Sequence, residues 1–148
     1  MISDQYQPPP CFRNPTGYTL RIVTGSRKFE FQLDLLAPLT YLDGAGRDYE
    51  PGRHFWTDLG SIPWCVEWIP GYSRNRLAFI FHDSTYNTVP GLGHGLYVRA
   101  AGFHEFRWVS LTRRQSDDLM REMLLAEGVH PATARCIWAA VRVFGRRW

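Results

Sequence analysis

The sequence predicts a single α+β domain in which small antiparallel sheets are followed by three helices. Two patterns indicate this fold class. Apolar and polar residues alternate over much of the first half, and apolar residues recur at helical spacing in three later segments. The chain has 148 residues, of which 45% are hydrophobic and 21% charged. This composition is typical of one globular domain and excludes a disordered chain.

The N-terminal segment differs from the rest of the chain in its proline content. Pro8, Pro9, Pro10 and Pro15 all fall within residues 1–16, and such a segment favours an extended conformation. We therefore expect an extended, Pro-rich arm over residues 1–16. A globular domain is expected over residues 17–148, with a hairpin inserted at about 95–110.

The expected strands come in pairs, each pair separated by a turn-forming sequence. Gly25-Ser26 separates the first pair, Asp43-Gly44-Ala45-Gly46 the second and Arg99-Ala100-Ala101-Gly102 the third. The paired segments are 18–22 with 29–33, 39–42 with 48–50, and 96–98 with 103–109. Each pair predicts an antiparallel hairpin.

The expected helices cover 73–86, 112–126 and 131–144. Ser73 is a good N-cap for the first, and Thr112 begins the second, which Gly128 ends. Pro131 is suited to the first position of the third helix, and Gly145 ends it. The helices therefore fall mainly in the second half.

Charge and composition exclude several functional classes. The net charge of +3 comes with arginines that are dispersed along the chain, which argues against nucleic-acid binding. No apolar run is long enough for a transmembrane segment, and the N-terminus lacks a signal-peptide pattern. Three scattered cysteines without CxxC spacing predict neither a disulfide framework nor a zinc site.

Four polar residues need a structural explanation because their positions point inward. His82 and Asp83 lie on the apolar side of the helix over 73–86, and Asp117 shares a face with apolar residues of the next helix. Asp58 lies in a loop with apolar flanks. Burying such groups without partners costs several kcal/mol, so each is expected to have one.

These residues are open to two interpretations. A histidine oriented by a carboxylate is a general base near neutral pH, and further carboxylates with loop carbonyls suit a hard cation such as Ca²⁺. Alternatively, the same residues form a buried hydrogen-bond cluster that ties the loop to two helices. Their spacing alone does not decide between the two.

Four motifs follow one another along the chain: FWTDLGSIPW, FIFHDSTYN, RRQSDDLMREMLLAEGV and AAVRVFG. Together they resemble the phage-associated family known as domain of unknown function 1353, and the resemblance covers residues 30–145. The motif positions are Thr57, Asp58, Ser61, Pro63, His82, Asp83, Tyr86 and Asp117. The chain departs from the pattern in two ways: Ser116 stands where Ala is usual, and residues 87–112 are longer than the typical connection.

The same order of motifs is similar, more distantly, to secreted phospholipase A2. That resemblance implies His82 as the general base and Asp117 as its partner, with Tyr86 hydrogen-bonded to Asp117. It also implies a calcium site, with Thr57 and Ser61 in supporting positions. The implied calcium ligands are the carboxylates of Asp58 and Asp83 and the carbonyl of Leu59. The paired cysteines and Gly-rich calcium loop of those enzymes are absent from this sequence.

Two functions follow as expectations. One is a phage-encoded, metal-dependent hydrolase in which His82 activates water. The other is a non-catalytic virion component, in the tail or another assembly, that contacts other phage proteins through residues 1–16 and 96–109. Either protein is expected in the host cytoplasm during expression, and the second also in the virion.

Overall fold

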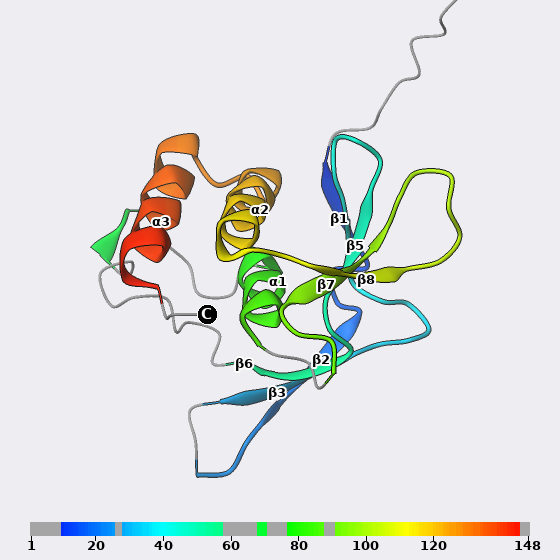
Figure 1. The fold of residues 1–148 in the computed structure, drawn as a ribbon. Coiled ribbons are helices and arrows are strands. Elements are labelled where there is room, and N and C mark those ends of the chain that lie inside the picture. The colour runs from blue at the N-terminus through cyan, green and yellow to red at the C-terminus, as the bar shows by residue number, and fades with distance from the viewer. Residues whose placement is uncertain (1–9, 26–27, 58–67, 71–76, 88–90, 146–148) are drawn as a thin grey trace, which may run out of the picture.

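The α+β fold predicted from the sequence is confirmed. The computed structural model describes residues 10–25, 28–57, 68–70, 77–87 and 91–145. Within them lie two antiparallel sheets and three helices (Figure 1). The elements are β1 (Cys11–Arg13), β2 (Tyr18–Ile22), β3 (Phe29–Leu33), β4 (Thr40–Leu42), β5 (Asp48–Glu50), β6 (His54–Thr57), α1 (Leu77–Tyr86), β7 (Gly95–Arg99), β8 (Arg107–Ser110), α2 (Arg113–Ala126) and α3 (Pro131–Phe144).

The larger sheet has five strands in the order β1-β4-β5-β7-β8. Its central strand, β5, pairs Tyr49 with Tyr41 on one side and with Val98 on the other. Because side chains alternate across a strand, Tyr49 faces the core while Asp48 and Glu50 share the opposite face. The β5–β7 pairing joins segments on either side of α1 in the sequence.

The smaller sheet has three strands in the order β2-β3-β6. Its register places Leu20, Phe31 and Phe55 side by side across the sheet. The rings of Phe31 and Phe55 stack with centroids 4.5 Å apart, and Tyr18 lies 5.4 Å from Phe31 on the other side. This row of aromatic rings forms the buried face of the sheet.

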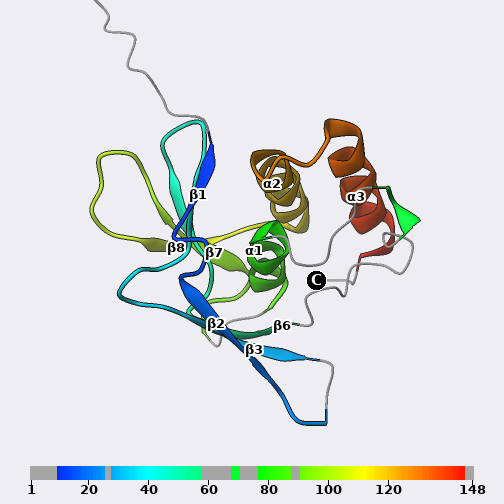
Figure 2. The ribbon, with the colours of Figure 1, turned by 180° about the vertical axis from the view of Figure 1, so that it is seen from behind.

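The helices form a layer beside the sheets, as the two opposite views show (Figures 1 and 2). Helix α1 contacts β7 of the larger sheet, β6 of the smaller sheet and α2, while α3 packs on α2. Since α1 has neighbours on several sides, its residues from Ala78 to His82 are all buried. Any polar group on α1 must therefore find its partners within the protein.

Strand β6 was not expected from the sequence, and the bounds of β4 and β7 differ from the expected ones by one residue. Larger differences occur at three further places. Residues 11–13, expected within the arm, form β1 and pair with β4. Strand β8 begins at Arg107 rather than at 103, because Gly102 has a positive φ and the Phe103 amide bonds back to the Ala100 carbonyl at 3.1 Å. Helix α1 is described from Leu77, and the expected cap Ser73 lies outside the described residues.

None of the helices in the described ranges is long and apolar enough to cross a membrane.

Candidate functional site

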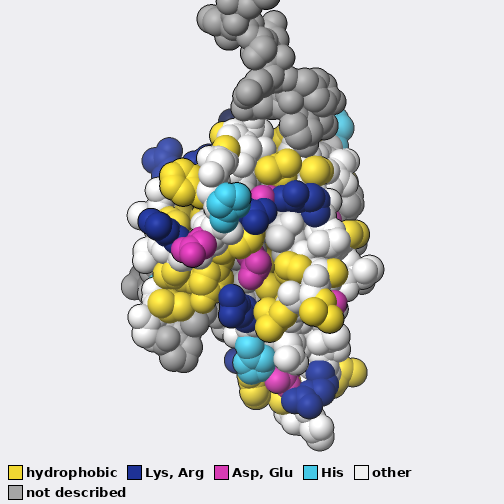
Figure 3. Space-filling view, turned by 90° about the vertical axis from the view of Figure 1, so that its right-hand side faces the viewer, with side chains coloured by type: hydrophobic (Ala, Val, Ile, Leu, Met, Phe, Trp, Pro, Cys, Tyr) yellow, Lys and Arg dark blue, Asp and Glu magenta, His cyan; other side chains and the backbone are white. Residues whose placement is uncertain are grey.

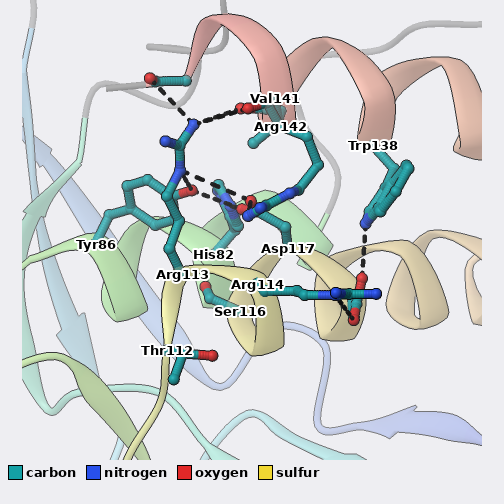
Figure 4. A network of polar contacts seen from close by, with 12 residues as sticks. His82, Tyr86, Thr112, Arg113, Arg114, Ser116, Asp117, Trp138, Val141 and Arg142 are labelled. Carbon is teal, nitrogen blue, oxygen red and sulfur yellow. Dashed lines mark hydrogen bonds and ion pairs between the residues drawn. The ribbon is translucent and has the colours of Figure 1, made fainter. Parts of the chain in front are cut away.

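Asp117 is the centre of a polar network formed by all three helices (Figure 4). It lies on α2 and is fully buried. Its Oδ1 atom lies 2.7 Å from Nε2 of His82 and accepts a 2.6 Å hydrogen bond from the Tyr86 hydroxyl, both on α1. Its Oδ2 atom accepts a 3.0 Å bond from Nη1 of Arg142 on α3. The helix packing thus supplies donors to both carboxylate oxygens.

These donors keep Asp117 ionised. Burial raises the pKa of this carboxyl, but hydrogen bonds from His82, Tyr86 and Arg142 outweigh it, so the pKa is lowered from its usual value. Burial and the bond to Asp117 raise the pKa of Tyr86, which therefore remains a neutral donor. The site holds one buried negative charge beside the His82 ring.

The ionised Asp117 determines which nitrogen of His82 carries the proton. A carboxylate can only accept, so Nε2 of His82 must donate, and the neutral ring then has its lone pair on Nδ1. Among the described residues, no side chain or backbone group makes a hydrogen bond to Nδ1. The side chain of His82 is 8% exposed, and its ring packs against that of Tyr86 with centroids 4.3 Å apart.

Arg113 joins this network to the end of α3. Its Nε donates to the Tyr86 hydroxyl at 3.3 Å and lies 3.9 Å from Oδ2 of Asp117. Its Nη2 lies 3.0 Å from the carbonyl of Val141 and 3.2 Å from that of Gly145. Because the last carbonyls of a helix lack internal partners, this cation satisfies the end of α3.

Arg142 was expected from the sequence only as a cation at the end of the last helix, and the contacts of Arg113 and Arg142 with Asp117 were not predicted. Arg113 precedes Asp117 by four residues, a spacing that brings side chains together on a helix. Arg142 belongs to the AAVRVFG motif. The spacing of Arg113 from Asp117 and the place of Arg142 in this motif are the sequence signals that could have identified both residues as part of the site.

Ser116, at a position where the family resemblance leads us to expect Ala, makes a contact that Ala cannot make. Its hydroxyl bonds with that of Thr85 on α1, and Thr85 also donates to the His82 carbonyl at 2.6 Å. Both side chains are almost fully buried. The departure therefore adds a polar tie between the helices that carry His82 and Asp117.

Asp83 and Thr57 come together at the junction of α1 with β6. The Thr57 hydroxyl donates to Oδ2 of Asp83, and the side chain of Asn87 donates to the Asp83 carbonyl at 2.6 Å. Asp58, Leu59 and Ser61 lie outside the described residues.

The metal-ligand roles of Asp58, Asp83 and Leu59 stay predictions. In the portion of the chain that the structure describes, no group of three or more His, Cys, Asp or Glu residues is arranged to hold a metal ion. Asp83 is the one predicted ligand that falls within that portion.

A separate set of charged residues lies on the face of the larger sheet opposite Tyr49. Asp48 bonds to Arg13 and to Nη2 of Arg99, the latter at 2.7 Å. Glu50 is 7% exposed, and its burial raises the pKa of its carboxyl despite the nearby positive charges of Arg53 and Arg99. Figure 3 shows acidic, basic and apolar side chains interspersed on one face of the molecule.

Comparison with known proteins identifies a family. The chain has no significant match among curated proteins or among solved structures. The family model described as "Protein of unknown function (DUF1353)" matches residues 33–141. This range includes His82, Tyr86, Asp117 and most of the other residues of the polar network. The chain belongs to the DUF1353 family.

Proposed function

We propose that this DUF1353 protein is a phage-encoded hydrolase in which His82 activates a water molecule for attack on an ester. The observation that carries the proposal is the arrangement of the imidazole. Nε2 lies 2.7 Å from the ionised Asp117, whereas Nδ1 makes no hydrogen bond to any described residue. A histidine held in one tautomer with its second nitrogen available is suited to general-base catalysis.

In the proposed reaction, Nδ1 of His82 takes a proton from water as the water oxygen attacks the ester carbonyl. Asp117 stabilises the resulting imidazolium through Nε2. The proton then passes from Nδ1 to the departing alkoxide as the carbon–oxygen bond breaks. The products are an acid and an alcohol, and His82 returns to its neutral form.

Tyr86 and Arg142 serve this reaction as positioning residues. Each donates a hydrogen bond to Asp117, at 2.6 and 3.0 Å respectively. Two fixed donors hold the carboxylate plane in place, and the carboxylate in turn fixes the ring of His82. A dyad built from two helices keeps its geometry best when both partners are held in this way.

Hydrolysis of p-nitrophenyl esters of increasing acyl length tests the proposal. Replacing His82 with Gln should lower kcat/KM by at least about 100-fold, the usual contribution of a general base. His104→Gln is the matched control, because His104 is exposed on the β7–β8 hairpin. Wild-type rates no higher than those of buffer, or equal rates for wild type and His82→Gln, would contradict the proposal.

Calcium binding is a further part of this proposal, with Asp58, Asp83 and Leu59 as the ligands. Calorimetric titration with Ca²⁺ should show heat of binding for wild type and a loss of about tenfold or more in affinity for Asp83→Asn. Asp34→Asn removes an exposed carboxylate and is the control. No binding to wild type would show that the reaction must proceed without this cation.

The exposed β7–β8 hairpin favours a second candidate function, that of a virion component. Phe103 at its tip is 65% exposed, so a large apolar side chain is accessible there for contact with another protein. In this case residues 1–16 and 96–109 bind other phage proteins. Phe103→Ser should then abolish incorporation into particles while leaving the ester assay unaffected.

A further inference from the structure

A groove of about 710 Å³ lies between α2 and the turn that joins β4 to β5. Glu122, Leu125 and Ala126 of α2 form one wall, and residues 43–45 with Arg47 form the other. Tyr41 and Pro10 complete the lining. None of these residues belongs to the network around Asp117, so the groove is independent of the proposed hydrolase site.

Tyr41 brings an unused polar group to this groove. Its side chain is 1% exposed, and its ring lies 5.0 Å from that of Phe12 and 6.0 Å from that of Tyr49. No described residue makes a hydrogen bond to its hydroxyl. Tyr41 lines the groove, and its hydroxyl is not one of the enclosed polar atoms without a partner among the described residues. The hydroxyl is therefore open to the groove and can bond a ligand atom there.

The carboxylate of Asp43 is already used within the turn. Its Oδ1 accepts the backbone amides of Ala45 and Arg47, each at 2.9 Å. Its Oδ2 accepts Nε of Arg47 and the Tyr49 hydroxyl, also at 2.9 Å. Four donors satisfy this carboxylate, so Asp43 holds the shape of the turn and its charge is balanced by Arg47.

Glu122 gives the lining of the groove an excess of one negative charge. No described residue makes a hydrogen bond to its carboxylate, although Arg47 and Arg121 lie near enough to act on it electrostatically. Glu122 is an exposed residue, and partial desolvation of its carboxylate, followed by the charge of Asp43, raises its pKa. With Asp43, Glu122 and Arg47 as the charged lining groups, the net charge is −1.

We propose that the groove binds an organic cation, an alkylguanidinium or alkylammonium group on an apolar stem. The charged head donates hydrogen bonds to the carboxylate of Glu122 and to the hydroxyl oxygen of Tyr41. The stem lies against Leu125 and Ala126 of α2. An anionic ligand is disfavoured, since it would meet the carboxylates of both Glu122 and Asp43.

Isothermal titration calorimetry tests this site with two ligands that both carry an alkylguanidinium group. Agmatine represents a free cation, and a capped Gly-Arg-Gly tripeptide represents a basic protein segment. Its citrulline analogue keeps the shape without the charge and should bind at least about tenfold more weakly. Binding of agmatine, of the arginine peptide or of both supports the site and identifies the source. No binding of either at about 10 mM would overturn the proposal.

Two variants locate the binding within the groove. Glu122→Gln should weaken the affinity about tenfold or more, since it removes a charge-assisted bond. Tyr41→Phe should weaken it about threefold and keeps the ring packed, so the fold is retained. The control Asp34→Asn removes a carboxylate outside the groove and should have no effect. Unchanged affinity in Glu122→Gln would overturn the proposal even if Tyr41→Phe fails to fold.

Discussion

Asp117 contributes to folding stability in a way that depends on pH. Its folded-state pKa is lowered, so folding favours the ionised form, and the contribution is present above the unfolded pKa of about 3.9. It is lost as pH falls below that value through the folded pKa. Asp117→Asn should therefore cost about 3 kcal/mol at pH 7, and this cost should shrink as pH falls below about 3.9.

Urea unfolding between pH 3 and 7 measures this dependence. The difference in unfolding free energy between wild type and Asp117→Asn should narrow toward the acid end of this range. Ser116→Ala, next to it in the chain, changes no charge and should run parallel to wild type over the whole range. A constant gap between Asp117→Asn and wild type would contradict the assigned ionisation.

The contribution of Glu50 to folding stability should have the opposite pH dependence. Its pKa is raised in the folded state by burial, so folding favours the protonated form, and stability is lost as pH rises from about 4.5 through the folded pKa. Glu50→Gln removes this loss. The variant should gain stability relative to wild type at pH 7 and not at pH 4, as measured by thermal unfolding at both values. A gain of equal size at both values would instead indicate improved packing.

The inward positions of the site residues could be predicted, but their full set of partners could not. His82 and Tyr86 are four residues apart on one helix, and Asp117 shares a face with Met120 and Leu124, so helical periodicity alone places them inward. Arg142 reaches Asp117 because α3 packs on α2 at a particular rotation. That rotation depends on contacts throughout the interface and has no local signature.

At the scale of elements, Glu127 links two helices through their ends. It follows the last residue of α2, and its carboxylate accepts the amides of Leu77 at 3.1 Å and Ala78 at 2.7 Å. A negative charge is unfavourable at the end of α2 but favourable beside these free amides of α1. The carboxylate of Glu127 therefore stabilises the start of α1 rather than the end of α2.

Glu127→Gln should destabilise the protein by about 1 kcal/mol, the usual contribution of a helix cap. The amides of Leu77 and Ala78 should exchange faster with solvent, and those of α3 should not change. Urea unfolding and amide hydrogen exchange measure both effects, with Glu105→Gln on the exposed hairpin as the control. Unaltered protection at Leu77 and Ala78 would rule out the capping role.

Local sequence predicted most element bounds but not the pairing of distant strands. Helix α2 begins after Thr112, whose side chain accepts the amide of Gln115 while Gln115 bonds back to Thr112, a motif readable from sequence. The pairings β3–β6 and β5–β7 join residues far apart in the chain. Alternating patterns identify strands without specifying such partners.

At the scale of the whole molecule, two phenylalanines should differ sharply in their effect on stability. Phe31 is fully buried in the smaller sheet, and Phe103 is 65% exposed on the hairpin. Phe31→Ala should cost about 3–5 kcal/mol, whereas Phe103→Ala should stay within about 0.5 kcal/mol. Urea unfolding of both variants measures the difference. A large loss for Phe103→Ala would mean that the hairpin belongs to the core.

The order of strands along the chain bears on how the protein leaves the ribosome. The smaller sheet is complete once residue 57 has emerged, but β5 acquires β7 only after residue 99. Until then β5 is an edge strand, the kind that pairs with strands of other chains. Asp48 and Glu50 place two negative charges on this three-residue strand. Charges on an edge strand disfavour pairing with other chains, so the same two carboxylates that become buried in the finished sheet make the exposed β5 a poor partner for foreign strands.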